Sequence, residues 1–403
     1  MEARWTLTLA LCTATLAAVA ACSSDSPAPT SGTQASDSAR QGNVWQGTIE
    51  ERNGVVHVRN PDAALWGDAT TSPLRFEPDG VFGGPAAQIS SIAGAVVDGD
   101  GNLHIYDAQQ SELIALSDDG AVLWRRGEHG DGVEQFDGVR GIAYDGADLI
   151  YVVNQNGTRL DAWGTDGTHR RSLSVADLGL GRVYMGGFLS THRIALLTDA
   201  VHNMAANEYV IVDLDTEPTV ETRFTIGAQP MVPIPPGVVL QLSHYFHDNN
   251  ILVGTWEQYV LRVYDARGAL RRRVTRPVDY LRRPGFAMVE KKYLGVALGG
   301  LAAPIVLDSG YWLVLATWPT NVDDPNALAE MPAAQRPEIM WASSLDLFDP
   351  EGRFLYSSHT PGAQSPTIGR PWAVGPHGRL YTVIADPFPQ VRRYRVVLQP
   401  PPN

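Results

Sequence analysis

Short hydrophobic runs separated by turn residues dominate the chain from about residue 92 to the C-terminus. The clearest stretch, residues 94–124, contains four such runs, and the turn sequences Asp98-Gly-Asp-Gly-Asn102 and Asp118-Asp-Gly120 lie between them. Apolar runs of this length bounded by Gly, Asn and Asp are typical of β-strands joined by tight turns. The pattern therefore predicts an antiparallel unit of four strands.

The same unit recurs six times along the chain, with a degenerate third copy. A turn residue opens the second strand in every copy, and these residues are Gly101, Gly146, His192, Asn250, Gly310 and Gly378. Subtracting successive positions gives spacings of 45, 46, 58, 60 and 68 residues, so the period lengthens where loops are inserted. Four-stranded repeats of about 40 to 50 residues are typical of propeller blades. We therefore expect an all-β fold, a six-bladed β-propeller.

A closed ring requires the two ends of the chain to meet, because a terminal blade would otherwise present an open edge. Residues 44–58 carry a hairpin signal around Asn53-Gly54. The last repeat is short of one strand after Val397. The sequence therefore predicts that an N-terminal strand from this hairpin region completes the sixth blade. Deleting residues 44 to 60 is then expected to lower the melting temperature sharply.

The first 21 residues differ from the rest of the chain. No charged residue occurs from Trp5 to Ala21, and this apolar run is typical of a signal-peptide core rather than a membrane span. It ends in Val19-Ala-Ala-Cys22, which resembles the bacterial lipobox. The resemblance implies cleavage before Cys22 and attachment of lipid to this residue. The alternative is a soluble secreted protein in which Cys22 is incidental.

Residues 22–43 are polar and rich in Ser and Pro, so they are expected to form a flexible tether between the lipidated Cys22 and a propeller over residues 44–398, followed by a short tail at 399–403. No Asp follows Cys22 directly, which by resemblance to lipoprotein sorting patterns favours the outer membrane. We therefore expect a lipid-anchored protein of the cell envelope whose globular domain is periplasmic or surface-exposed. The expected contact with the membrane is the lipid anchor on Cys22.

Composition argues against nucleic acid as a partner and against disulfides as a source of stability. The chain has 31 basic and 44 acidic residues, a formal net charge of −13, which argues against nucleic acid because phosphate binding depends on clustered Lys and Arg. Cys12 would leave with the signal peptide, so the mature domain would contain no disulfide. Its stability must come from the hydrophobic core.

The segment that joins the first two repeats carries a family resemblance. Residues 127–136 (Gly-Glu-His-Gly-Asp-Gly-Val-Glu-Gln-Phe) and the following Val139-Arg-Gly-Ile-Ala143 resemble the inter-blade signature of NHL-repeat-like propellers, with Val139-Arg140 where that family usually has Pro. Together with the lipobox, residues 44–398 resemble bacterial six-bladed β-propeller lipoproteins. The resemblance implies the fold and says little about chemistry, since fold does not fix function.

The sequence contains no Gly-x-Ser-x-Gly and no His-Glu-x-x-His motif. Asp98-Gly-Asp-Gly-Asn102 resembles the start of a calcium loop, but the twelfth position holds Gln109 where the bidentate acid is needed, so a hairpin turn is favoured. These observations predict no cofactor and no metal. Lyase and lactonase propellers nevertheless hold metals through side chains from several blades, and the candidate donors here are His244, His247, His192 and Asp199.

His244 and His247 would face opposite sides of one strand, which is poor geometry for a single metal ion. The alternative is that these residues belong to turns and the surface. Arg140 and Arg370 lie just before the innermost strands of the second and sixth repeats, near the rim of the central channel. Two guanidiniums there could hold a carboxylate or a phosphate. Alternatively, they bond loop carbonyls between blades.

Two insertions interrupt the repeats. In residues 321–339, Asp324-Pro325 predicts the start of a short helix that ends before Pro332, and residues 286–293 are expected to form a second helix on one face. Long excursions from a rigid scaffold often carry binding function.

Two functions remain open. The first is a binding module for a protein or a small anionic ligand, with Arg140, Arg370, His244 and His247 as candidate contacts. The second is a metal-dependent lyase or lactonase.

Overall fold

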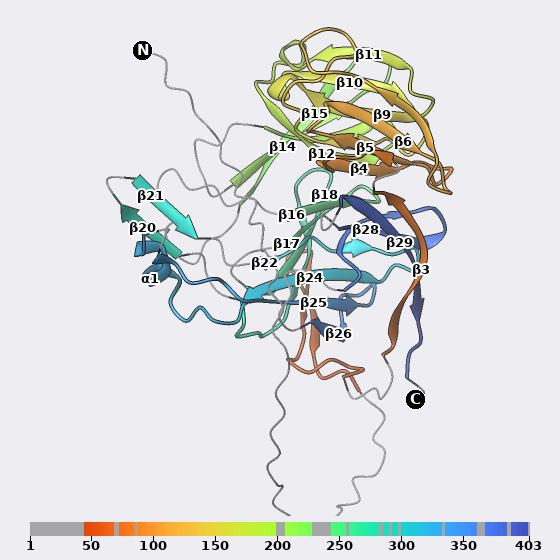
Figure 1. Ribbon diagram of the computed structural model, residues 1–403. Coiled ribbons are helices and arrows are strands. Elements are labelled where there is room, and N and C mark those ends of the chain that lie inside the picture. Colours follow the sequence, from red (N-terminus) through yellow and green to blue (C-terminus); the bar gives the residue numbers. More distant parts are fainter. Residues whose placement is uncertain are drawn as a thin grey trace, which may run out of the picture. The chain divides into compact units, whose positions relative to one another are not determined.

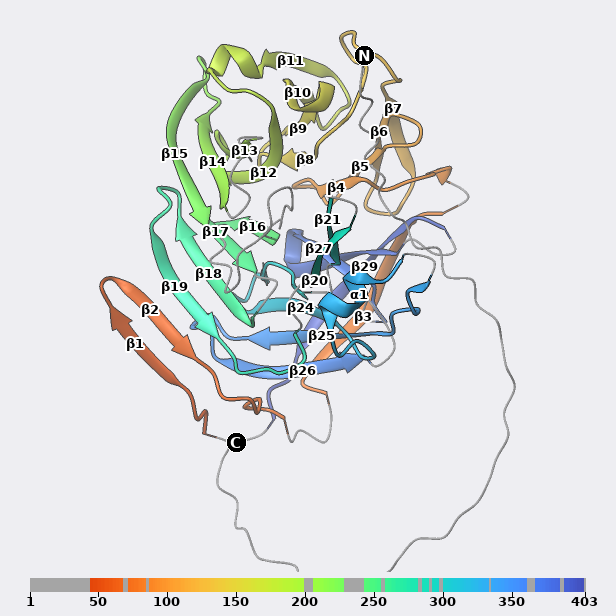
Figure 2. The same cartoon turned by 90° about the vertical axis from the view of Figure 1, so that its left-hand side faces the viewer.

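Six antiparallel sheets lie in a ring and form a six-bladed β-propeller (Figure 1, Figure 2). The computed structural model describes residues 44–67, 72–84, 87–198, 206–227, 243–254, 258–281, 285–289, 292–296, 300–332, 335–360, 367–384 and 388–401. The predicted fold class is confirmed. None of the helices in these residues is both long and apolar enough to cross a membrane.

The first three blades follow the chain in order, and in each the first strand is innermost. Blade 1 contains β4 (Gly94–Val97), β5 (Leu103–Asp107), β6 (Glu112–Leu116) and β7 (Val122–Arg126). Blade 2 contains β8 (Ile142–Tyr144), β9 (Leu149–Asn154), β10 (Arg159–Gly164) and β11 (His169–Ser174). Blade 3 contains β12 (Val183–Ser190), β13 (Arg193–Thr198), β14 (Ala206–Asp213) and β15 (Thr219–Gly227).

The last three blades carry the additions to the basic unit. Blade 4 contains β16 (Ser243–His247), β17 (Asn250–Gly254), β18 (Val260–Asp265) and β19 (Leu270–Thr275). Blade 5 contains the short β22 (Gly300–Leu301) and β23 (Ile305–Val306), then β24 (Trp312–Pro319), β25 (Trp341–Phe348) and β26 (Phe354–Thr360). Blade 6 contains β27 (Arg370–Gly375), β28 (Arg379–Ile384), β29 (Gln390–Leu398) and the N-terminal β3 (Leu74–Gly83).

A register shift recurs at one place in all six blades, between the third and fourth strands. The residues that immediately precede it in the third strand are Ala115, Ala162, Ile211, Val263, Leu347 and Arg393. Because a β-bulge increases local twist, this shared irregularity gives the blades a common twist. It also fixes which residues of different blades are structurally equivalent.

An N-terminal strand closes the ring, as predicted, but it is not the expected one. β3 pairs antiparallel with β29, with Leu74 opposite Leu398 and Gly83 opposite Gln390. The hairpin around Asn53-Gly54 does form, from β1 (Thr48–Arg52) and β2 (Val55–Arg59), yet β2 pairs in parallel with β19 and extends blade 4. The prediction that residues 44–60 close the sixth blade is therefore wrong. The physical reason is Val58, which is fully buried in the core between blades 4 and 5.

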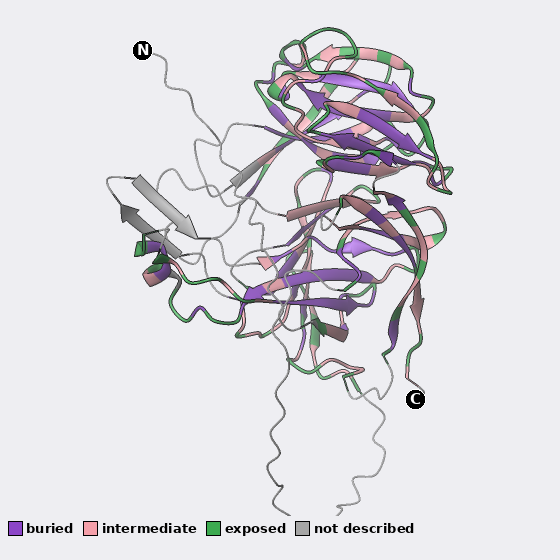
Figure 3. Ribbon diagram, viewed as in Figure 1, coloured by how far each residue is buried: buried purple, intermediate pink, exposed green. Residues whose placement is uncertain are grey.

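Hydrophobic clusters fill the interfaces between consecutive blades, where Figure 3 shows the buried strands. Between blades 2 and 3, for example, Val153 of β9, Leu196 of β13 and Val210 of β14 share one cluster and are completely buried. Each such side chain adds about 1.5 to 3 kcal/mol relative to an exposed one. The blades are therefore held together mainly by apolar packing.

Side-chain hydrogen bonds join four blades to the next blade, from the fourth strand in blades 1, 2 and 4 and from the third strand in blade 6. In each case a donor reaches a carbonyl in the turn between the third and fourth strands of that neighbour. The pairs are Trp124 with Thr165 (2.9 Å), Arg171 with Leu214 (2.7 Å), Arg272 with Pro350, and Arg393 with Asp118 (3.1 Å). These contacts satisfy carbonyls at the blade edges that would otherwise need water.

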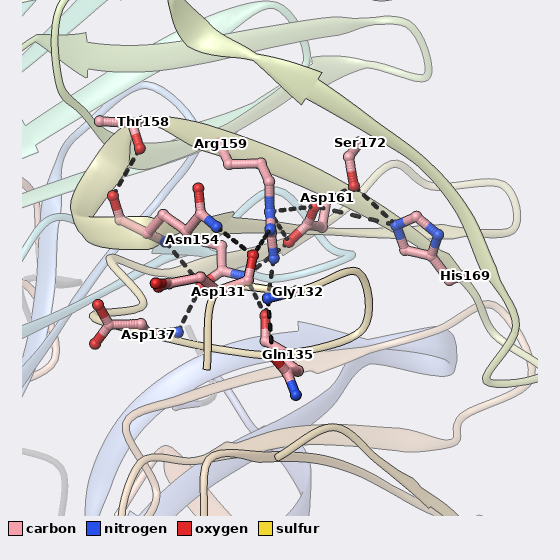
Figure 4. A network of polar contacts seen from close by, with 11 residues as sticks. Asp131, Gly132, Gln135, Asp137, Asn154, Thr158, Arg159, Asp161, His169 and Ser172 are labelled. Carbon is pink, nitrogen blue, oxygen red and sulfur yellow. Dashed lines mark hydrogen bonds and ion pairs between the residues drawn. The ribbon is translucent and has the colours of Figure 1, made fainter. Parts of the chain in front are cut away.

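The linker of residues 127–138, between blades 1 and 2, is held by blade 2 (Figure 4). The side chain of Asn154, at the end of β9, accepts from Asp137 N at 3.0 Å and donates to Gln135 O at 2.8 Å. Arg159 donates to Gln135 O at 2.8 Å and to Asp131 O at 2.9 Å. In blade 1, Asp107 at the end of β5 accepts from the incoming Ser90 N in the same way. In blades 1 and 2, these end-of-strand residues anchor the loop that enters the blade.

The two insertions pack against each other. The predicted helix is confirmed as α1 (Pro325–Glu330), and the Asp324 side chain caps it by accepting from Asn326 N and Ala327 N. Residues 286–293 do not form a helix, and that prediction is wrong. They belong to the hairpin of β20 (Gly285–Val289) and β21 (Lys292–Val296), which contacts α1 (Figure 2). The aromatic and β-branched residues Phe286, Val289 and Tyr293 favour strands, and five cross-strand pairs from Gly285↔Val296 to Val289↔Lys292 join the hairpin.

Candidate functional site

One face of blade 4 forms a continuous row across its strands. Tyr245 of β16 lies opposite Leu252 of β17, Leu252 lies opposite Val263 of β18, and Val263 lies opposite Arg272 of β19. Val56 of the added hairpin lies beside Arg272 and continues the row. The hairpin therefore widens this face beyond the usual four strands.

Blade 5 provides the opposite wall through the turn between β23 and β24. Val306 and Trp312 are paired across this turn and are buried, with Trp312 only 6% exposed. The Arg272 guanidinium carbon lies 5.7 Å from the centre of the Trp312 ring. Arg272 also donates to Pro350 O, so its side chain bridges the two blades.

A groove of about 430 Å³ opens between these walls and the tip of the hairpin. Its volume is within the range of about 300 to 1,000 Å³ that small-molecule sites occupy. The apolar floor is formed by Leu252, Val263, Val306 and Trp312. The polar rim carries Glu51, His247, Arg271 and Arg272. An apolar floor with a few polar groups at the rim is the usual composition of a binding site for an organic molecule.

The charges on the rim are unequally neutralised. Arg271 donates twice to the Asp265 carboxylate, at 2.9 and 2.6 Å, and His247 lies 3.2 Å from the Asp248 carboxylate. No carboxylate of a described residue lies within ion-pair distance of Arg272. Burial lowers the pKa of Arg272, although the acids Glu351 and Asp349 oppose that effect. Arg272 is therefore a partly buried cation that donates a hydrogen bond to the neutral carbonyl of Pro350.

The two predicted histidines do not converge, as the alternation of side chains along a strand requires. His247 lines the groove toward blade 5. His244 faces blade 3, where its ring meets the Tyr209 ring edge-on with centres 6.0 Å apart. His192 is exposed in the turn before β13, and Asp199 lies outside the described residues. Within the described ranges, no group of three or more His, Cys, Asp or Glu side chains could hold a metal ion.

The calcium-like sequence forms a turn, in agreement with the interpretation favoured from the sequence. The Asp98 carboxylate accepts from Asp100 N at 3.0 Å and Asn102 N at 2.8 Å, and it lies 2.9 Å from the His104 ring. Burial raises the pKa of Asp98, but the hydrogen bonds from His104 and Asn102 outweigh it and leave the pKa below its usual value. The carboxylate is thus satisfied within its own hairpin.

Arg140 and Arg370 occupy comparable positions at the start of inner strands. Arg140 N donates to Val153 O at 2.8 Å, and Arg370 lies opposite Val383 in β28. The Arg140 guanidinium carbon lies 4.4 Å from the centre of the Tyr184 ring, so this side chain packs between blades 2 and 3. Arg370 is exposed. A shared anion between the two arginines stays a prediction.

Arg272, Leu252 and Trp312 are the site residues that the sequence did not single out. They become visible once the repeats are aligned on a structural feature. If the six copies are aligned on the bulge after the third strand, Leu252 falls in a column where blades 1, 2 and 6 have His104, Tyr151 and Tyr381. Blades 3 and 5 have Ala195 and Leu313 in that column. Blade 4 is distinguished by combining Leu252 with an arginine, Arg272, in the fourth strand, where blades 3 and 5 have Thr222 and Tyr356.

Comparisons with known proteins give neither a family nor an activity. No family model matches the chain, and no curated protein matches it. Among solved structures, it is similar to a DUF4221 family member from Bacteroides vulgatus at 11% identity and a TM-score of 0.48, covering 80% of this chain and 98% of that one. It is also similar to a protein of unknown function from Bacteroides thetaiotaomicron at 14% identity and a TM-score of 0.43, covering 80% and 73%. A third, BamB from Moraxella catarrhalis, has 12% identity and a TM-score of 0.34, covering 79% and 90%.

Proposed function

We propose that this protein is a lipid-anchored β-propeller of the bacterial cell envelope that acts as a binding module and holds a ligand between blades 4 and 5. The observation that carries the binding role is the groove of about 430 Å³ between these blades, with its apolar floor and polar rim. The lipobox that ends at Cys22 and the polar tether after it support the location at the cell envelope. A lipid on Cys22 would hold the propeller at a membrane surface, and the tether would leave the groove free to meet its ligand.

The enzymatic alternative depends on three or more metal ligands that converge. The described residues bring no such group together, so no specific observation favours a metal-dependent lyase or lactonase. The proposal therefore concerns binding. A protein partner on the ring surface stays compatible with the same anchor, but the groove is shaped for a smaller molecule.

The binding role can be tested with an envelope extract that contains ligands of every charge class. The purified propeller, residues 44–403, is incubated with the extract, and bound small molecules are identified by native mass spectrometry. Leu252→Tyr serves as the matched variant, because a larger side chain in this row should occupy the groove. We expect at least one compound that binds the wild-type protein and not the variant. An identical set of bound compounds for both proteins would contradict binding in the groove.

Lipid attachment and membrane association are tested separately in cells. The full chain and its Cys22→Ser variant are labelled with an alkyne fatty acid and separated into membrane and soluble fractions. We expect label and membrane association for the wild-type protein only, because a thiol is needed to carry the lipid. Equal membrane association of the two proteins would remove the anchor from the proposal.

A further inference from the structure

The repeated register of the blades identifies the residues that fill each inter-blade gap. Three cross-strand neighbours form an equivalent triplet in each blade, one each from the second, third and fourth strands. In blade 2 the triplet is Tyr151, Ala162 and Arg171, and in blade 1 it is His104, Ala115 and Trp124. In blade 4 it is Leu252, Val263 and Arg272.

In blades 1 and 2 the outer two members of the triplet contact each other and fill the gap. The Tyr151 hydroxyl accepts from Arg171 Nη2 at 2.9 Å, and the same nitrogen donates to Leu214 O of blade 3. In blade 1 the rings of His104 and Trp124 lie 5.6 Å apart. The second-strand residue is thus a large polar ring that meets the fourth-strand donor.

Blade 4 has a hydrogen-bond donor in its fourth strand, Arg272, but its second-strand residue, Leu252, has no ring. Arg272 donates to Pro350 O of blade 5, just as Arg171 donates to Leu214 O of blade 3. Leu252 is shorter than tyrosine and has no hydroxyl, so no hydroxyl of a described residue accepts from Arg272. All three members of the blade 4 triplet, Leu252, Val263 and Arg272, line the groove.

We infer that the groove binds a small organic carboxylate with a flat apolar body, which takes the place of the missing tyrosine. The carboxylate would accept from the free donors of Arg272 in a two-point contact, and the body would lie on Leu252, Val306 and Trp312. This inference rests on the proposed binding function and names its ligand class. The charge argument depends on Arg272, since Arg271 is already paired with Asp265. Glu51 opposes an anion from the rim, but it is exposed and therefore screened by solvent.

The probe for this test is 2-naphthoate, and 2-naphthalenemethanol is its neutral counterpart of nearly the same shape. Binding to residues 44–403 is measured by isothermal titration and by the quenching of tryptophan fluorescence. We expect saturable binding of one naphthoate per chain, about tenfold or more tighter than that of the alcohol, because a charge-assisted contact to Arg272 is present only in the acid. Glu51→Gln should tighten naphthoate binding by about twofold or more, since it removes the opposing charge.

Two pairs of variants separate a binding role from a structural one. Leu252→Tyr should abolish naphthoate binding because it restores the residue of blade 2, whereas Leu252→Met, which conserves volume, should retain it. Arg272→Met should weaken naphthoate about tenfold and leave the alcohol unchanged. Arg171→Met breaks the equivalent bond in blade 2 and controls for lost blade contacts, so it should leave both affinities unchanged.

The outcomes distinguish this inference from the proposed function. Absence of saturable naphthoate binding, or equal affinities for the acid and the alcohol, overturns the carboxylate inference. The binding function would still stand if the extract yields another compound that Leu252→Tyr excludes. Naphthoate binding that survives Leu252→Tyr would also overturn the inference, because the probe would then lie elsewhere on the ring.

Discussion

Asp79 in β3 and Arg393 in β29 form an ion pair at 3.0 Å, which joins the first strand of the ring to its last. Arg393 also donates to Asp79 O at 2.9 Å and to the backbone and side chain of Asp118 in blade 1. Its own side chain is only 7% exposed. One guanidinium therefore connects the N-terminal strand, the C-terminal strand and the next blade.

Replacing Asp79 should weaken ring closure. We expect Asp79→Asn to lower the free energy of unfolding by roughly 1 to 3 kcal/mol, because it leaves a buried arginine with less charge compensation. The matched control is Glu77→Gln in the same strand, whose pair with Arg395 spans 3.7 Å between half-exposed groups and should be worth about 0 to 0.5 kcal/mol. Urea denaturation measures both. Equal losses for the two variants would show that Asp79 has no special role in closure.

Deleting residues 44–60 should loosen blades 4 and 5 rather than open the ring. The deletion removes Val58 from the core and removes Asn60, whose side chain donates to Gly352 O at 3.0 Å and accepts from Phe354 N at 2.6 Å. Lost burial and an orphaned amide together should cost about 3 kcal/mol or more. Hydrogen exchange should rise in β19 and β26 and stay slow in β3 and β29. Faster exchange confined to blade 6 would contradict this assignment of the hairpin.

The linker between blades 1 and 2 should not tolerate a side chain at Gly127. This glycine has a φ of +96°, and a Cβ there would overlap the ring of the fully buried Phe136. Gly146 is the control, since its φ is +83° but nothing lies within 4 Å of an added Cβ. Gly146→Ala should cost about 1 to 2 kcal/mol for its backbone conformation, and Gly127→Ala should cost about 1 to 3 kcal/mol more for the overlap. Chemical denaturation of the two variants gives the difference, and similar losses would remove the ring contact as a constraint.

Tyr245 should make the protein sensitive to alkaline pH. Burial, with a contribution from Asp308, raises the pKa of Tyr245 to about 12, whereas an unfolded tyrosine ionises near 10. The folded state therefore keeps its proton between these values while the unfolded state loses it, so the stability present below pH 10 falls as pH rises to 12. This group alone should account for about 2 kcal/mol of the loss at pH 12. Tyr245→Phe should show a shallower decline above pH 10, and parallel curves for both proteins would contradict the shift.

Local sequence patterns were sufficient to predict the blades but not the N-terminal strands that are added to them. The turns at Asp98 and Gly146 could be located because each lies between two apolar runs, and local hydrogen bonds in fact close both turns. β3 escaped detection because Pro78 and three charged residues interrupt its apolar pattern. It forms a strand because β29 offers an unpaired edge, which is a long-range condition.

By itself, the sequence determined the fold class, the number of blades and the turns inside them, since short apolar runs and turn chemistry act between near neighbours. Only the tertiary structure decided which strand closes the ring, where the hairpin docks and where a groove remains. These outcomes depend on how side chains from different blades meet, and the groove beside Leu252 and Arg272 stays open only because the facing blade does not fill it. Contacts between residues distant in sequence carry that choice, and no local pattern encodes it.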